Sequence, residues 1–135
     1  MTKTSITPML TVRGASAAID FYGRAFGATE VSRQTTPSGQ IIAEMDIEGN
    51  RFFAVDENPA GFNLSPDALG GTSVRLSLVV DDPDAAATRA IAAGATEIFP
   101  IADQPYGMRQ GRVQDPHGHH WLIGKYLERS DAKQR

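Results

Sequence analysis

The 135-residue sequence contains no cysteine, which excludes disulfides, thiolate-bound zinc, iron–sulfur clusters and a thiol nucleophile. Long hydrophobic runs are missing as well, since no stretch approaches the roughly 18 apolar residues of a membrane span. The amino-terminal segment, MTKTSITPML, lacks the apolar centre of a signal peptide. We therefore expect a cytoplasmic protein without a membrane partner.

The sequence has no excess of basic residues. It carries 13 Lys and Arg against 16 Asp and Glu, a net charge of −3, which is unlike a general nucleic-acid binder. It also lacks a phosphate-binding glycine loop and the Gly-x-Ser-x-Gly elbow of hydrolases. What is present, 41% hydrophobic and 21% charged residues, is typical of one globular domain.

An internal repeat organises the chain. Three pairs of similar segments occur in the same order and at nearly the same displacement, namely 9–14 with 77–82, 27–31 with 94–98, and 49–53 with 118–122. Ordered matches of this kind indicate two copies of one unit, each about half of the chain.

Each copy has the pattern of a β-α-β-β-β unit, which predicts the α+β fold class. Alternating and β-branched segments predict strands, and Gly27 and Gly94 are suited to end the two helices. The first copy is expected to place its elements at 6–12, 15–26, 29–35, 41–47 and 51–56, and the second at 74–80, 83–93, 96–100, 109–114 and 120–125. The predicted organisation is a single domain of two modules, 5–57 and 73–128, with a linker loop at 58–72 and a flexible tail at 129–135.

One helix covers only one face of a four-stranded sheet. The other face must meet the second sheet or a partner chain, because an uncovered sheet leaves apolar side chains and edges unpaired. We expect the two sheets to enclose a cleft, and we expect a homodimer. The modules can pair within one chain or across two chains, and the sequence leaves both open.

The repeat and the segment 106–121, YGMRQGRVQDPHGHHW, resemble the vicinal oxygen chelate superfamily. This superfamily includes glyoxalase I, bleomycin and fosfomycin resistance proteins and extradiol dioxygenases. The Gly-x-Arg-x-Gly strand before Asp-Pro-x-Gly-His resembles its PhnB-like subgroup, with His117 where that subgroup usually has Phe. The resemblance covers about residues 6–128 and implies two mixed or antiparallel sheets around a cleft.

The resemblance also implies a divalent metal bound by the first and last strands of each copy. In this sequence the corresponding positions are Thr7, Phe53, Arg75 and Leu122. None is His or a carboxylate, and Arg75 adds a fixed positive charge. We expect no metal and no cofactor. A different metal site at His117, His119 and His120 is the alternative to a surface turn with one histidine lining the cleft.

Period-two alternation from Leu122 assigns side chains to the cleft, with Phe52 and Trp121 left for the core. The residues predicted to bind a ligand are Met9, Phe53, Arg75, Tyr106, Arg109, His120 and Leu122. Arg75 either anchors an anionic group or pairs with Glu44, and Tyr106 and Arg109 are expected at the cleft mouth.

The favoured function is binding, without metal, of a small organic ligand that is anionic or aromatic and antibiotic-like. The alternative is a lyase, isomerase or dioxygenase-like enzyme in which His120 is the catalytic base and Arg75 holds the substrate, or which uses an unrecognised metal site. A third hypothesis is an interaction module whose cleft is filled by its own side chains.

Overall fold

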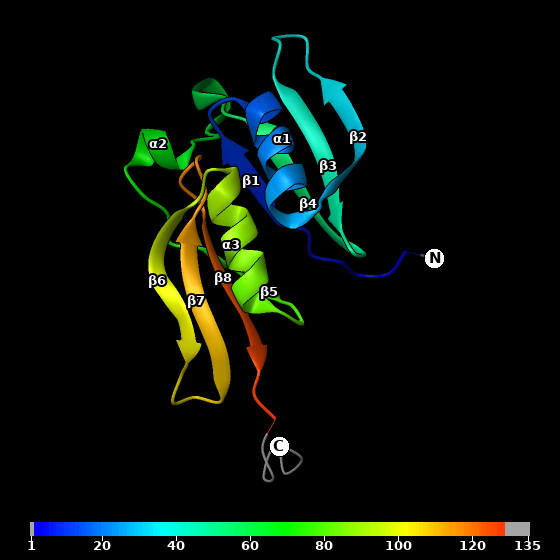
Figure 1. Ribbon diagram of the computed structural model, residues 1–135. Coiled ribbons are helices and arrows are strands. Elements are labelled where there is room, and N and C mark those ends of the chain that lie inside the picture. The colour runs from blue at the N-terminus through cyan, green and yellow to red at the C-terminus, as the bar shows by residue number, and fades with distance from the viewer. Residues whose placement is uncertain (1, 129–135) are drawn as a thin grey trace.

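The computed structural model describes residues 2–128 and contains two units of the same topology (Figure 1). The first consists of β1 (Met9–Val12), α1 (Ala15–Phe26), β2 (Thr29–Thr35), β3 (Ile41–Ile47) and β4 (Asn50–Asp56). The second consists of β5 (Arg75–Val79), α3 (Pro83–Ala93), β6 (Thr96–Asp103), β7 (Met108–Gln114) and β8 (His120–Tyr126). The sheet orders are β1-β4-β3-β2 and β5-β8-β7-β6, each with one parallel pair, β1 with β4 and β5 with β8. The predicted α+β fold with two mixed sheets is confirmed.

The helix ends follow from local chemistry. Gly27 ends α1 in the left-handed conformation, with φ of 70°, which glycine adopts without steric cost. Asp82 caps α3 by accepting a hydrogen bond from the backbone N–H of Ala85 at 3.1 Å. Both helices therefore have the bounds that the sequence predicts.

Strands β1 and β6 differ from the predicted boundaries by three residues at one end, the other strands differ by at most one residue at an end, and the linker is not entirely a loop. β1 begins at Met9 rather than residue 6, because Pro8 has no N–H to donate to a ladder. β6 continues to Asp103, which pairs with Arg109 of β7. The predicted linker loop contains a 3-10 turn, η1 (Pro59–Gly61), and a short helix, α2 (Pro66–Leu69). The predicted tail at 129–135 lies outside the described residues.

The two units share one hydrophobic core, in which α1 packs against α3. The ring of Phe26 lies 4.6 Å from that of Trp121 in the other unit, and Tyr22 lies 5.7 Å from it, measured between centroids. Phe52 and Trp121 are 4% and 3% exposed, which confirms their predicted place in the core. The helices of both units thus lie on the same side as this core.

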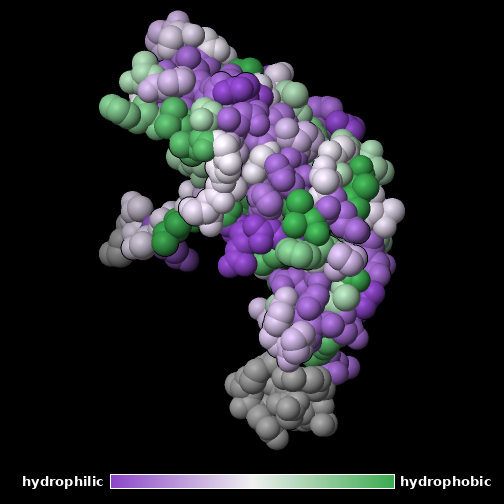
Figure 2. Space-filling model, turned by 90° about the vertical axis from the view of Figure 1, so that its left-hand side faces the viewer, coloured by the Kyte–Doolittle hydropathy of each residue, from purple (hydrophilic) through white to green (hydrophobic). Residues whose placement is uncertain are grey.

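The sheet faces opposite the helices are open. In β5, exposed Arg75, Ser77 and Val79 alternate with half-buried Leu76 and Leu78. Figure 2 shows a crescent-shaped molecule with a hollowed side. A hollow of about 790 Å³ between the units is lined by residues of both, among them Arg51 and Ser77. We call these helix-free surfaces the bare faces.

Within residues 2–128, no helix is long and apolar enough to cross a membrane.

Candidate ligand site on the second sheet

Strand β8 divides its side chains between the core and the bare face, as the alternation predicted. Trp121 and Ile123 are buried against the helices, whereas His120 and Leu122 are half-buried on the other side. His120 is flanked by Arg75 of β5 in the parallel register and by Gln114 of β7 in the antiparallel one. The bare face of the second sheet therefore brings Arg75, His120 and Leu122 together.

A hydrogen bond fixes the state of His120. The Nε–H of Arg112, in β7, donates to Nδ1 of His120 at 2.9 Å. Because an accepting nitrogen carries no proton, the neutral ring has its proton on Nε2. Partial burial lowers the pKa of His120, and the positive charge of Arg112 lowers it further. Near neutral pH, His120 thus offers Nε2–H as a hydrogen-bond donor.

Two pockets lie on either side of this hydrogen bond. The first, of about 290 Å³, is lined by Phe99, Pro100, Ala102, Gln104, Tyr106, Gln110, Gly111, Arg112 and Leu122. The second, of about 320 Å³, is lined by Pro66, Asp67, Gly70, Gly71, Gln114, Gly118 and His120. Arg112 lines the first pocket and His120 lines the second, so the hydrogen bond between them connects the two pockets. We call this region the second-sheet site.

Tyr106 lines the first pocket of the second-sheet site. Its hydroxyl donates to Oε1 of Gln110 at 2.8 Å, and 62% of the residue is exposed. The side-chain amide of Gln110 and the ring of Tyr106 are thereby held over β7. The exposed ring is available for contact with an apolar ligand.

Arg75 is exposed, and its side chain forms no hydrogen bond or ion pair with any residue from 2 to 128. The alternative pairing with Glu44 is wrong, since Glu44 accepts a hydrogen bond from Arg51 at 2.9 Å. Asp46 binds the same Arg51 at 3.0 Å. Carboxylates on the first sheet are thus bound by Arg51, and Arg75 remains directed to solvent.

Arg109 is not brought to the second-sheet site. Its guanidinium forms two hydrogen bonds of 2.8 Å with Asp84 of α3 and one of 3.0 Å with Asp103 of β6. These contacts raise the pKa of Arg109 and hold its side chain toward the helix. The predicted position at the cleft mouth is incorrect, because Arg109 points to the opposite side of β7 from Arg112.

Met9 and Phe53 lie on the bare face of the first sheet. They are direct partners in the parallel pairing of β1 with β4. Neither lines the two pockets of the second-sheet site. A single chain therefore separates the predicted ligand-binding residues into a first-sheet pair and a second-sheet group.

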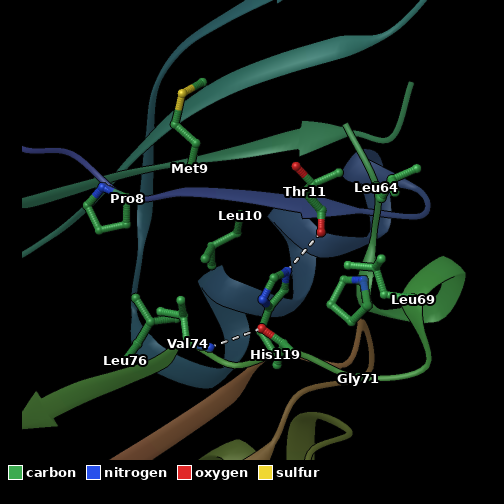
Figure 3. Close-up of a pocket in the computed structure, with 12 residues that line it drawn as sticks. Pro8, Met9, Leu10, Thr11, Leu64, Leu69, Gly71, Val74, Leu76 and His119 are labelled. Atoms are coloured by element: carbon green, nitrogen blue, oxygen red, sulfur yellow. Dashed lines mark hydrogen bonds between the residues drawn. The ribbon is translucent and has the colours of Figure 1, made fainter. Parts of the chain in front are cut away.

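The histidines at 117 and 119 are not on the surface, so the expected surface turn is wrong. They are 7% and 8% exposed, because their backbone N–H groups donate to the buried Oδ1 of Asp115 at 2.8 and 3.0 Å. Nε2 of His119 lies 2.8 Å from the carbonyl oxygen of Thr11, in the other unit (Figure 3). The part of the chain that the structure describes holds no group of three His, Asp or Glu residues positioned for a metal ion.

His119 also lines a third pocket, which the sequence did not indicate. This pocket, of about 300 Å³, lies between β1, the linker with α2, and the start of β5, and Met9, Leu64, Leu69 and Val74 contribute to its apolar wall (Figure 3). Its residues come from segments far apart in the chain. Only the packing of the two units brings them together.

The four positions that the resemblance assigns to metal ligands do not fit a divalent cation. Thr7 offers a hydroxyl, Phe53 and Leu122 offer only hydrocarbon, and Arg75 carries a permanent positive charge. Divalent ions in proteins are bound by imidazole, thiolate or carboxylate groups and by oxygen ligands. The side chains at these four positions therefore do not match the ligand set of a divalent cation.

Arg112 is the functional candidate that sequence reasoning missed. Strand alternation could have identified it, because it lies one position beyond Gly111 on the face opposite Arg109.

A model of the glyoxalase-like domain matches residues 8–123. The chain belongs to this family. An uncharacterized protein of Mycobacterium bovis is 42% identical over 125 residues, which cover 90% of this chain and 82% of the relative. The crystal structure of TioX from Micromonospora sp. ML1 is 27% identical, with a TM-score of 0.72, and covers 93% of this chain and 100% of that one.

The same fold occurs in TnmS3 from Streptomyces sp. CB03234, an antibiotic binding protein. It is 23% identical with a TM-score of 0.65, and the match covers 93% of this chain and 99% of TnmS3. The superfamily resemblance is thus confirmed for this glyoxalase-like protein. The PhnB-like subgroup, the cytoplasmic location and the lack of nucleic-acid and membrane partners stay predictions.

Proposed function

We propose that this glyoxalase-like protein binds a small organic ligand at the second-sheet site without a metal ion. The observation that carries the proposal is the bond between Arg112 and His120, which joins two pockets on one face of a sheet. The first pocket has the mostly apolar wall of a small-molecule site, and the second is more polar, with Asp67, Gln114 and His120.

The wall chemistry supports a ligand with an aromatic or apolar body. Phe99, Tyr106 and Leu122 line the first pocket, and exposed fractions of 59% and 62% leave the two rings accessible. Ring–ring contacts of this type contribute about 0.5–1.5 kcal/mol beyond the burial of area. TnmS3 shares this fold and binds an antibiotic, which makes an antibiotic-like molecule a reasonable ligand class.

A homodimer is part of the proposal. Met9 of the first sheet and Val79 of the second are 59% and 50% exposed on the bare faces, so both sheets present large apolar side chains that a second copy could cover. In a symmetric dimer, Met9 and Phe53 of one copy can face the second-sheet site of the other. The ligand-binding residues that one chain separates would then lie around the same cleft.

Binding is better supported than catalysis by His120. A general base at Nδ1 needs a free lone pair, but that lone pair accepts the hydrogen bond from Arg112. Nε2 carries the proton in the neutral ring and acts as a donor. The enzyme alternative, with Arg75 as substrate holder, would require this hydrogen bond to break before each proton transfer.

A thermal-shift screen with aromatic acids, aromatic alcohols and antibiotics tests the proposal. A ligand that binds the native state at 100 times its Kd stabilises it by about 2.7 kcal/mol and raises Tm. The same compounds should have little effect on Leu122→Asn, whereas Ile91→Asn, on exposed α3, should respond like the wild type. The proposal fails if no compound class raises Tm. Stoichiometric Zn, Ni, Mn or Fe in the purified protein would overturn its metal-free form.

A further inference from the structure

Two arginines and a histidine lie on the bare face of the second sheet without a carboxylate bound to them. Arg75 on β5 pairs with His120 on β8, and Arg112 on β7, which pairs with Leu122, donates a hydrogen bond to the ring of His120. Among residues 2–128, neither arginine forms an ion pair, although seven side-chain ion pairs occur elsewhere. The charge of these two guanidinium groups is therefore unbalanced at the surface.

Two acids lie close to this group in the structure, and neither binds its arginines. Asp115 is buried and accepts hydrogen bonds from Tyr22, Trp121 and two backbone N–H groups. Asp67 lines the same pocket as His120, but within residues 2–128 it forms no ion pair with Arg75 or Arg112.

All side-chain groups that this cluster presents to a ligand are donors. Arg75 has its whole guanidinium available, and Arg112 uses only Nε, at 2.9 Å from His120. His120 adds Nε2–H, because its other ring nitrogen is occupied. A surface that only donates hydrogen bonds and carries positive charge binds anionic oxygens far better than neutral groups.

We infer that Arg75, Arg112 and His120 bind an anionic oxygen group of the ligand, a carboxylate or a phosphonate. In this site Arg112 has a second role as a positioning residue, since it fixes His120 as the Nε2–H tautomer. The inference rests on the proposed function and names its ligand class. The adjacent pocket with Phe99, Tyr106 and Leu122 accommodates the apolar part of the same molecule.

Three probes of similar size separate the anionic group from the ring. Benzoate and phenylphosphonate carry the two candidate anions on a phenyl ring, and benzyl alcohol carries the same ring without charge. NMR titration of the whole chain measures each Kd and locates the perturbed backbone amides. We expect both anions to bind at least 10-fold more tightly than benzyl alcohol and to perturb β5, β7 and β8.

Arg75→Gln and Arg112→Gln should each weaken benzoate and phenylphosphonate binding about 10-fold, with little change for benzyl alcohol. Arg33→Gln is the matched control, because Arg33 on β2 pairs with the core residue Ala43, on the helix side of the first sheet, and is bound to Glu30. This variant removes the same charge and should retain wild-type affinity. Equal losses in all three variants would reduce the effect to net charge and overturn the inference.

The tautomer of His120 tests the positioning role of Arg112 directly. If Arg112 only stabilised the fold, its substitution would leave the tautomer unchanged. Long-range ¹H–¹⁵N spectra distinguish protonation at Nδ1 from protonation at Nε2. We expect Nε2–H in the wild type and a mixture of tautomers in Arg112→Gln, with His120 unchanged in Arg33→Gln.

The outcomes separate the inference from the proposed function. If benzyl alcohol binds as tightly as the anions, the site takes an apolar ring but no anion, and only the inference is wrong. If Arg112→Gln binds the anions as tightly as the wild type does, the inference is also wrong. If no probe binds and the thermal-shift screen finds no ligand, both proposals fail.

Discussion

The hydroxyl of Tyr22 in α1 donates a hydrogen bond of 2.6 Å to Oδ2 of Asp115, which belongs to the other unit. Nε1 of Trp121 donates to the same oxygen at 3.0 Å, and two backbone N–H groups donate to Oδ1. Burial raises the pKa of Tyr22 well above its usual value, and the charge of Asp115 adds to the effect. The buried carboxylate therefore ties the turn before β8 to the first helix.

Tyr22→Phe should destabilise the protein by about 1–3 kcal/mol, because Oδ2 of Asp115 loses one of its two donors inside the core. The aromatic packing against Phe52 is retained, which isolates the hydroxyl. Chemical denaturation measures the free energy of unfolding. Tyr106→Phe is the control, since that phenol is 62% exposed, and it should cost less than about 0.5 kcal/mol. Equal effects of the two substitutions would contradict this role for Tyr22.

The arrangement of strands and faces could be predicted because it depends on local patterns. The alternation of Phe52 with Phe53 and of Trp121 with Leu122 separates core from bare face, and the structure agrees. The glycine at the end of α1 is likewise a local requirement of the chain. The bounds of the helices could be predicted because they do not depend on how the two units pack.

The polar contacts of the site depend on packing between segments far apart in sequence. His119 is buried because its ring reaches Thr11 of the other unit, and no local pattern contains that contact. Strand alternation places Arg109 and Arg112 on opposite faces of β7, but the ion pair of Arg109 with Asp84 depends on where α3 packs. The sequence therefore indicated which side chains lie on the bare faces more accurately than it indicated their polar contacts.

Gly111→Ala should destabilise the second unit. A Cβ at Gly111 would lie 2.7 Å from the carbonyl oxygen of Phe99 and 2.8 Å from the backbone of Ile101, both in β6. Strands β6 and β7 would have to separate, at a cost of about 1–3 kcal/mol. The loss appears as a lower Tm and as faster amide exchange in β6.

Gly23→Ala is the matched control for this substitution. A Cβ at Gly23, within α1, would meet only the carbonyl oxygen of Ala28 at 3.5 Å, an ordinary contact. Alanine favours the helix by about 0.8–1.0 kcal/mol, so Tm should stay equal or rise. A Gly111→Ala protein as stable as Gly23→Ala would show that β6 can move away without cost.

His120 should titrate below its ordinary pKa near 6.5, because partial burial and the charge of Arg112 both disfavour the imidazolium. The charge of Asp115 raises the pKa of His120, and His119 lowers it. Arg75 on β5 is the other charged residue next to His120. NMR titration of the ring carbon-bound protons measures the pKa. Arg112→Gln should raise it, and a value that stays unchanged would contradict the Arg112 contact.

The same shift has a defined effect on stability. A lowered pKa in the folded state means that the unfolded chain binds more protons between that value and about 6.5. The contribution of His120 is therefore fully present above pH 6.5 and is lost as the pH falls through the folded pKa. Wild type should lose more Tm than His120→Gln between pH 7.5 and 5.5. A larger loss of Tm in His120→Gln would mean that the pKa of His120 is not lowered by folding.

The exposed bare faces predict a homodimer in solution, which sedimentation velocity at micromolar concentration can detect. Val79 is 50% exposed on β5, and Val79→Glu would place a charge in the expected interface. The variant should dissociate to monomers without loss of secondary structure. Ile91→Glu, on the exposed side of α3 with 40% exposure, introduces the same charge outside the expected interface and should leave the dimer intact. A wild-type monomer at these concentrations would refute the shared cleft, and the second-sheet site would then have to bind its ligand within one chain.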